Sequence, residues 1–278
     1  MALNNKDFER LSRFIYGQFG IKMPGAKQTM LEGRLAKRVR MLKLNSFTEY
    51  CDFLFSEKGQ KEELVHLINA VTTNKTDFFR EPAHFDYLTR TVLPTLAGTS
   101  GAGVRNKLKI WSAGCSTGEE PYTLTMVLSE YALAHPEFSA GYSILATDIS
   151  TRVLQMAKNA VYHTDRIAPI TQPLRKKYLL RNKDKNNPVV RIVPELRNQV
   201  TFGRLNFMDE DFGLREQLDI IFCRNVIIYF DKETQERLMN KFCRYLVPGG
   251  YLFLGHSESQ HGYNLPLVQV SPTVYQRQ

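Results

Sequence analysis

The sequence predicts an α/β fold in which a mostly parallel, doubly wound sheet follows a helical N-terminal domain. Two observations lead to this prediction. From the start of the chain to about residue 85, apolar residues recur at helical spacing and no convincing strand is found. From Lys107 onward, short β-rich runs alternate with amphipathic helical segments, which is typical of a parallel sheet with crossover helices.

The composition is that of a globular protein of 278 residues, 43% hydrophobic and 23% charged. No apolar run approaches the ~18 residues that a membrane-spanning helix requires, and the first ten residues lack the apolar core of a signal peptide. The four cysteines lie far apart and form no C-x-x-C pair, which favours reduced thiols over disulfides or zinc. We therefore expect a cytoplasmic protein without a metal, and a monomer by default.

A basic stretch stands out in the helical domain. Residues 20–48 contain seven cations against one anion, a local net charge of +6 in a chain of net charge +9. On the helix predicted over about residues 29–43, Arg34, Lys37 and Arg38 lie off the apolar stripe and close together. An acidic partner is indicated, which could be nucleic acid, anionic lipid or an acidic protein surface, unless the charge serves only solubility.

The second part of the chain is predicted to contain regular elements and one insertion. Strands are expected at 108–112, 142–147, 200–204, 218–223, 251–255, 268–270 and 273–277, and helices at 121–134, 150–160 and 231–246. Residues 163–199 break the alternation and predict an inserted β-subdomain, whereas residues 96–106 predict an exposed flexible loop. The predicted domains are residues 1–85, helical domain and linker, and residues 86–278.

The first predicted strand runs into a loop of small residues. Residues 114–118, Gly-Cys-Ser-Thr-Gly, match the nucleophile elbow of α/β-hydrolases, and Ser116, Asp219 and His256 could supply a triad. A hydrolase elbow comes after several strands, however, and only helical sequence precedes this one. A phosphate-binding P-loop is also disfavoured, because no Lys-Ser or Lys-Thr follows the second glycine.

A nucleotide-type loop fits the same residues better. Gly114 and Gly118 would let the backbone approach a cofactor, and Asp148, at the end of the second strand, could accept both ribose hydroxyls. Glu119 and Glu120 would repel a pyrophosphate but attract an ammonium group, which favours S-adenosylmethionine over NAD. An acidic helix N-terminus, favoured by the helix dipole alone, is the competing interpretation of these two carboxylates.

Two further strand ends are expected at the same site. Asn206 and Phe207 follow the third strand, where an amide can contact the adenine edge and an apolar side chain can cover its face. Residues 223–230 follow the fourth strand, where the transferred group would lie. Together these ends predict a cofactor site at the carboxyl edge of the sheet.

Several ordered motifs resemble those of one family. They are Thr-Thr-Asn-x-Thr-x-Phe-Phe-Arg-Glu (72–81), Ser-Thr-Gly-Glu-Glu-Pro-Tyr (116–122), Ala-Thr-Asp-Ile (146–149), Ile-Phe-Cys-Arg-Asn-Val-x-Ile-Tyr-Phe (221–230) and Gly-His-Ser-Glu (255–258). Together, over nearly the whole chain, they resemble the CheR family of bacterial chemotaxis receptor methyltransferases. The resemblance implies a Rossmann-like S-adenosylmethionine-dependent methyltransferase domain with an inserted β-subdomain, preceded by an all-α domain. It also implies methylation of receptor glutamates, with S-adenosyl-L-homocysteine as product.

The resemblance also implies roles for individual residues. Cofactor contacts would fall on Asn74, Thr76, Arg80, Glu120, Asp148, Asn206, Phe207, Arg224 and Asn225. Residues 72–82, otherwise a capped linker, would fold back over the cofactor. Arg80 and Tyr229 would hold the substrate carboxylate in position. Docking of the acidic receptor helices would fall on Arg34, Lys37, Arg38 and Arg40.

Two other functions compete with this interpretation. An RNA methyltransferase could use the basic domain to hold RNA, but the basic stretch lacks interleaved aromatics for base stacking, so no nucleic acid is expected. A non-catalytic, cofactor-binding regulatory module is disfavoured because the motif residues are intact. Residues 182–187 lack the glycines associated with family members that bind receptor tails, which disfavours tail docking. We expect the enzyme in the cytoplasm at receptor arrays, without membrane insertion.

Overall fold

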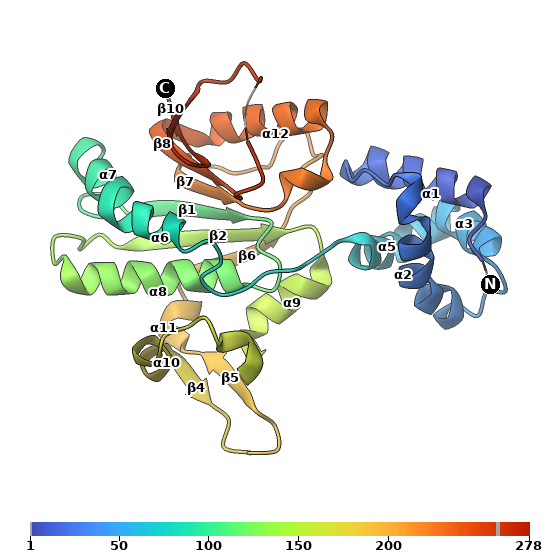
Figure 1. Cartoon of the computed structure of the whole chain (residues 1–278), viewed down its shortest axis with the longest axis horizontal. Helices are drawn as coiled ribbons and strands as arrows, with labels where there is room; N and C mark the ends of the chain where they lie inside the picture. Colours follow the sequence, from blue (N-terminus) through green and yellow to red (C-terminus); the bar gives the residue numbers. More distant parts are fainter. Residues whose placement is uncertain (1, 260–261) are drawn as a thin grey trace.

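The computed structural model describes residues 2–259 and 262–278, and its helical N-terminal part lies to one side of the part that contains the sheet (Figure 1). The N-terminal part consists of α1 (Asn5–Phe19), the 3-10 helix η1 (Gly25–Lys27), α2 (Gln28–Met41), α3 (Phe47–Phe55), α4 (Glu57–Glu62) and α5 (Leu64–Val71). This arrangement confirms the all-helical N-terminal domain that the apolar spacing predicted.

Local sequence determines where these helices begin and end. Asn4 caps α1 by accepting a hydrogen bond from the backbone N–H of Asp7, and Gly20 ends it in the left-handed conformation, with φ of +69°. Ser46 and Ser56 cap α3 and α4 with their hydroxyls. Isolated helices of this length are marginal in water, so a shared core must stabilise them. That core includes the fully buried Leu11, Ile15, Leu31, Leu35, Tyr50 and Ile68.

Residues 72–82 follow α5 without a regular helix or strand and include a turn at residues 78–79, and α6 (Ala83–Tyr87), the π-helix η2 (Leu88–Val92) and α7 (Leu93–Thr99) follow without a break. The prediction of an exposed loop at residues 96–106 was wrong, because α7 extends into this segment and residues 101–103 are buried. A Cβ at Gly103, where φ is +80°, would lie 1.9 Å from the ring of Phe138. This turn is therefore packed against the core and requires glycine.

The second part contains a seven-stranded sheet in the order β6-β2-β1-β7-β8-β10-β9. Its strands are β1 (Leu108–Ala113), β2 (Tyr142–Asp148), β6 (Val200–Arg204), β7 (Leu218–Cys223), β8 (Leu246–Leu254), β9 (Leu267–Ser271) and β10 (Val274–Arg277). The strands from β6 to β8 pair in parallel, whereas β10 runs antiparallel to its neighbours. The carboxyl ends of the parallel strands therefore meet at one edge, where ligands bind in sheets of this kind.

Helices cover both faces of this sheet. α8 (Glu119–Ala134) and α9 (Thr151–Asn159) lie on one face and α12 (Lys232–Tyr245) on the other (Figure 1). Successive side chains of β1 point to opposite faces of the sheet and belong to two different cores. Ile110 belongs to the core that includes residues of η2 and α8, whereas Trp111 packs edge-on against Phe242 of α12, with 5.3 Å between ring centroids. β8 begins at Leu246, earlier than the predicted residue 251, and its pairing with β7 passes through a register shift between Leu218 and Ile220.

The inserted segment forms a small antiparallel sheet that projects from the main body (Figure 1). Its strands β3 (Val161–His163), β4 (Leu179–Arg181) and β5 (Val189–Ile192) pair in the order β3-β5-β4. The 3-10 helix η3 (Thr164–Ile167) and α10 (Gln172–Tyr178) connect β3 to β4, and α11 (Pro194–Arg197) connects β5 to β6 of the main sheet. Throughout the described part of the chain, every helix is too short or too polar to cross a bilayer.

Candidate active site

A cavity of about 260 Å³ lies at the carboxyl edge of the sheet, between the sheet, residues 72–80 and the N-terminal helices. All residues predicted to contact the cofactor or the substrate carboxylate line it. They are Asn74, Thr76, Arg80, Glu120, Asp148, Asn206, Phe207, Arg224, Asn225 and Tyr229. Sequence reasoning missed the wall that comes from the N-terminal part, which no motif indicated. That wall consists of Phe19, Ile21, Met23, Lys27 and Met30.

The loop after β1 forms the floor of the cavity. Gly114 has φ of +84°, and a Cβ there would lie 2.6 Å from Val226 Cγ2, so only glycine fits between the loop and the residues after β7. Ser116 donates its hydroxyl hydrogen to the carbonyl oxygen of Asn74 at 3.0 Å. Asp219 accepts from the backbone of Lys109 at 2.8 Å, near the opposite end of the sheet. Ser116 and Asp219 therefore do not belong to a hydrolase triad.

Two buried carboxylates face the cavity. Asp148 accepts hydrogen bonds of 2.9 Å from the backbone N–H groups of Ser116 and Ser150, yet burial raises the pKa of its carboxyl above the ordinary value. Burial likewise raises the pKa of Glu120, against the opposite effects of Arg224 at 3.4 Å and the Ser112 hydroxyl at 2.7 Å. A ligand that brings positive charge or hydroxyl donors would stabilise the ionised form of both.

Glu119 does not share the role of its neighbour. Its side chain is fully buried away from the cavity lining and accepts from the Thr117 hydroxyl at 2.6 Å and from Arg166 at 2.5 Å. Burial raises its pKa despite these partners. Arg166, which lies in η3, also donates to the carbonyl oxygen of Thr76 at 2.9 Å. The interpretation of Glu119 as a cofactor contact is thus corrected: it pairs with Arg166, which joins the inserted subdomain to α8 and to residues 72–80.

Arg224, just after β7, is the centre of a charged network. Its side chain is 2% exposed and pairs with Glu81 at 3.0 Å and with Glu120 at 3.4 Å. It also donates to the carbonyl oxygen of Arg80. Glu81 accepts in addition from the side chain of Asn225 at 3.2 Å. Burial opposes ionisation of Glu81, but these partners outweigh it and lower the pKa of the carboxyl.

Glu258 fixes the other side of the loop after β7. It is buried and accepts hydrogen bonds from the backbone N–H groups of Gly255 at 2.6 Å, Asn225 at 2.8 Å and Ile228 at 3.3 Å. Burial raises its pKa against the effect of these donors. Asn225 has φ of +60°, so this loop is held in a conformation that non-glycine residues seldom adopt. Sequence reasoning gave Glu81 and Glu258 no role, although both lie within the motifs.

Asn206 and Phe207 occupy the end of β6. The Asn206 side chain donates to the carbonyl oxygen of Gln18 in α1 at 2.8 Å, so this amide joins the two parts of the molecule. The ring of Phe207 packs edge-on against Trp111 and Phe242, with centroid distances of 6.3 and 5.8 Å. Phe207 thus gives the cavity an apolar surface.

Arg80 and Tyr229 line the same cavity from different elements. Arg80 comes from the segment before α6 and donates to the carbonyl oxygen of Lys75 at 3.2 Å. Tyr229 ends the 3-10 helix η4 (Ile227–Tyr229), and its carbonyl oxygen accepts from the backbone of Lys22 at 3.0 Å. The ammonium group of Lys27 lies 5.9 Å from the centroid of the Tyr229 ring. Both parts of the molecule therefore position this tyrosine.

The basic residues of α2 divide into two kinds. Arg34 donates to the carbonyl oxygens of Val71 at 2.7 Å and Thr72 at 3.2 Å. Arg38 forms two bonds, of 2.9 and 2.6 Å, with the buried carboxylate of Glu63. The interpretation of these two as free docking side chains is therefore corrected, because both hold α2 against α5. Exposed positions on this helix include Lys37 and Arg40.

The residues present fit S-adenosylmethionine. Glu120 and Asp148 offer carboxylates for an ammonium group and for ribose hydroxyls, and Phe207 offers an apolar surface for a base. The close approach that Gly114 permits leaves the backbone of the loop open to a ligand. The chemistry of this donor set suits a ligand that is cationic at one end and aromatic at the other.

Comparison with known proteins agrees with this site. The model of the CheR methyltransferase all-alpha domain matches residues 6–72, and that of the CheR methyltransferase SAM-binding domain matches residues 74–275. A chemotaxis protein methyltransferase of Borreliella burgdorferi is 40% identical over 275 residues, covering 99% of this chain and 95% of the relative. One of Pseudomonas aeruginosa is 40% identical over 273 residues, covering 97% and 92%. One of Escherichia coli is 36% identical over 259 residues, covering 93% and 86%. The chain therefore belongs to the CheR methyltransferase family and is an S-adenosylmethionine-dependent methyltransferase.

Proposed function

We propose that the enzyme methylates glutamate side chains on the cytoplasmic domains of chemoreceptors and leaves S-adenosyl-L-homocysteine. The observation that carries this proposal is the placement of Arg80 and Tyr229 in one cavity with Glu120 and Asp148. A guanidinium and a phenol suit a carboxylate substrate, whereas the two carboxylates suit the cofactor. The relatives are named chemotaxis protein methyltransferases, which supports an acceptor in the same signalling system.

The reaction needs positioning more than proton transfer. When bound, S-adenosylmethionine supplies an electrophilic methyl group that a carboxylate oxygen can attack. A glutamate with a solution pKa of about 4.3 is already ionised near neutral pH, so no general base is required. Arg80 and Tyr229 hold the carboxylate in line and replace part of its hydration shell, and alignment of this kind can contribute roughly 7 to 11 kcal/mol. A grip that is too strong would stabilise the ground state and slow the reaction.

The N-terminal part supplies both a wall and a docking surface. Phe19, Ile21 and Met23 cover the cavity with apolar groups, which limits water around the reacting carboxylate. We take residues 1–85 as the docking domain with its linker, and residues 86–278, with the subdomain at 163–199, as the catalytic domain. Lys37 and Arg40 are the exposed cations of α2 that would attract acidic receptor helices. Arg34 and Arg38 contribute by holding this helix in place.

The enzyme would act in the cytoplasm at receptor arrays, as a monomer and without nucleic acid. Transfer of a radiolabelled methyl group to purified receptor cytoplasmic fragments, compared with transfer to RNA in the same assay, tests this proposal. We expect label on the receptor fragments only. Label on RNA, or on neither acceptor, would overturn the proposed substrate and leave the family assignment intact.

A further inference from the structure

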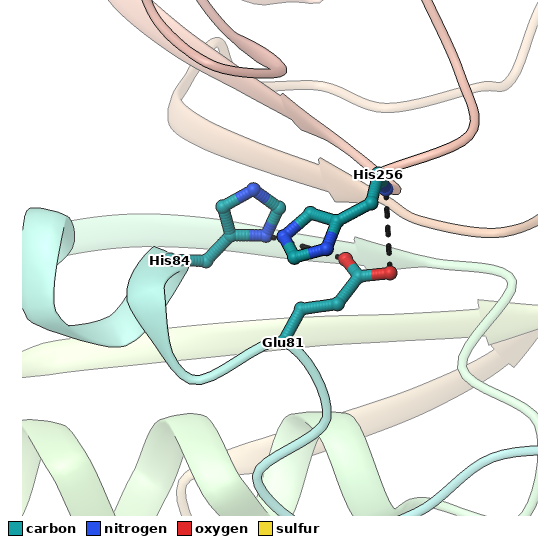
Figure 2. Close-up of side chains that lie close together, drawn as sticks. All are labelled: Glu81, His84 and His256. Carbon is teal, nitrogen blue, oxygen red and sulfur yellow. Dashed lines mark hydrogen bonds and ion pairs between the residues drawn. The ribbon is translucent and has the colours of Figure 1, made fainter.

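Glu81, His84 and His256 converge beside the network of Arg224, outside the cavity lining (Figure 2). They come from three separate places: the end of the linker, α6, and the residues after β8. One potential ligand atom from each lies within 4.8 Å of the other two. His84 Nδ1 is 3.6 Å from Glu81 Oε2, and the two histidine rings stand edge to face with 5.3 Å between centroids. The functional proposal above uses neither histidine.

His84 carries a nitrogen atom whose hydrogen-bonding capacity is unused. The residue is 3% exposed, and its Nδ1 is buried without a hydrogen-bond partner. Its other ring nitrogen, Nε2, lies 2.9 Å from the hydroxyl oxygen of Thr273. If Nε2–H donates to Thr273, Nδ1 presents a lone pair towards the cluster.

We propose that Glu81, His84 and His256 form a binding site for a transition-metal ion of the zinc type. Neutral imidazole and carboxylate are ordinary zinc ligands, with bonds of about 2.0 to 2.2 Å that place tetrahedral ligand atoms about 3.4 Å apart. The 3.6 Å between His84 Nδ1 and Glu81 Oε2 is close to that edge. His256 is exposed, so its side chain is free to approach and solvent can take the fourth position.

The contacts of His84 match those of a metal ligand in a second respect. Ligating histidines almost always donate their other ring N–H to an oxygen, which fixes the tautomer and the ring plane. Thr273, at the turn between β9 and β10, offers that oxygen to His84. A buried polar atom without a partner costs about 1 to 3 kcal/mol, and a metal bond to Nδ1 removes this cost.

Occupancy of this site is coupled to the cofactor cavity. Glu81 also pairs with Arg224, which in turn pairs with Glu120 in the cavity lining. A cation on Glu81 competes with the guanidinium and is repelled by it, so binding is weaker than at a structural zinc site. The site is built without the cysteines, whose spacing alone had suggested that no metal binds.

Titration of the tag-free, full-length protein with Zn²⁺ by calorimetry, and with Co²⁺ by visible absorption, tests this proposal. His256→Ala removes the exposed ligand, and His163→Ala, at an exposed histidine paired with Asp165 at 3.0 Å, is the matched control. Wild type and the control should bind one equivalent of Zn²⁺ and give the intense d–d bands of tetrahedral Co²⁺. His256→Ala should bind at least about tenfold more weakly and lose these bands.

A second readout separates ligation from a change in fold. Bound metal should raise the melting temperature of wild type and of His163→Ala, because it binds only the folded state, whereas the same Zn²⁺ concentration should raise that of His256→Ala by less. Equal binding by His256→Ala and wild type, equal losses in both variants, or no binding to wild type would each overturn the proposal. All of these outcomes are independent of which acceptor is methylated.

Discussion

Arg224 and Glu81 form a buried ion pair, with 3.0 Å between Nη2 and Oε2, although they lie 143 residues apart in the chain. The pair joins two segments, the linker that follows the N-terminal helices and the loop after β7. Arg224 lines the cavity, and Glu81, which lies outside the lining, follows directly after the lining residue Arg80. The pair therefore links the lining of the cavity to the stability of the fold.

Replacement of Glu81 by alanine should destabilise the protein strongly. It leaves the guanidinium of Arg224, 2% exposed, without its nearer carboxylate partner, because the contact with Glu120 is longer, at 3.4 Å. Loss of one partner of a buried pair costs about 3 to 5 kcal/mol in free energy of unfolding, measurable by denaturant titration. Glu57→Ala, which breaks the exposed pair with Lys61, is the control and should cost about 0 to 1 kcal/mol. If Glu81→Ala and Glu57→Ala lowered the free energy of unfolding equally, the Arg224–Glu81 pair would contribute no more to stability than the exposed pair.

Cofactor affinity should fall as the pH is lowered from about 8 to about 5. Burial raises the pKa of Glu120 and Asp148, so these carboxyls take up protons at higher pH than ordinary ones and lose their attraction for a cation and for hydroxyl donors. Glu120→Gln should weaken binding at neutral pH by about tenfold to a hundredfold and flatten this dependence. Calorimetry with S-adenosyl-L-homocysteine across the pH range measures both. An affinity that rises towards acid pH would contradict the assigned protonation states.

Charge reversal at exposed positions of α2 should weaken receptor docking without destabilising the fold. Lys37→Glu with Arg40→Glu alters two exposed side chains, and should raise KM for receptor fragments at low salt with little change in melting temperature. The difference from wild type should shrink as salt screens the charges. Arg38→Glu instead leaves Glu63 without its partner and should lower the melting temperature. Unchanged methylation by the double variant at low salt would remove the docking role.

Tyr229→Phe should lower kcat by about tenfold, the effect of one hydrogen bond to a charged group, while cofactor affinity changes less than twofold. The phenol is assigned to the substrate carboxylate and the cofactor keeps its own contacts. Steady-state kinetics with a direct binding measurement distinguish the two effects. Tyr131→Phe, on α8 outside the cavity lining, serves as control. Equal losses in kcat and in cofactor affinity would remove the positioning role of Tyr229.

The sheet was predictable where the sequence determines local structure. β1 and β2 were expected almost to the residue, because apolar runs bounded by turn residues define them. Residues 96–106 were mispredicted because Gly103 packs against Phe138, a contact between distant parts of the chain. The start of β8 was mispredicted for a similar reason, because pairing with β7 extends this strand back to Leu246.

The residues that line the site were predictable, but the residues that hold the lining in place were not. Glu119 and Glu120 are adjacent in sequence, but successive helical residues point about 100° apart, so only one of them faces the cavity. Arg34 and Arg38 were recognised as lying off the apolar stripe, yet their partners, Val71 and Glu63 at the two ends of α5, depend on how two helices pack. Glu81 and Glu258 act on residues far away in the chain, which a reading of strand ends does not reveal.

The most direct test of the account is the chemistry of the bond that the enzyme makes. Receptor cytoplasmic fragments would be incubated with enzyme and methyl-labelled S-adenosylmethionine, then treated with alkali, and the volatile label collected as methanol. We predict that wild-type fragments release their label, and that fragments with the candidate glutamates replaced by glutamine incorporate none. Label that survives alkali, or that persists in the glutamine fragments, would contradict transfer to a glutamate carboxylate.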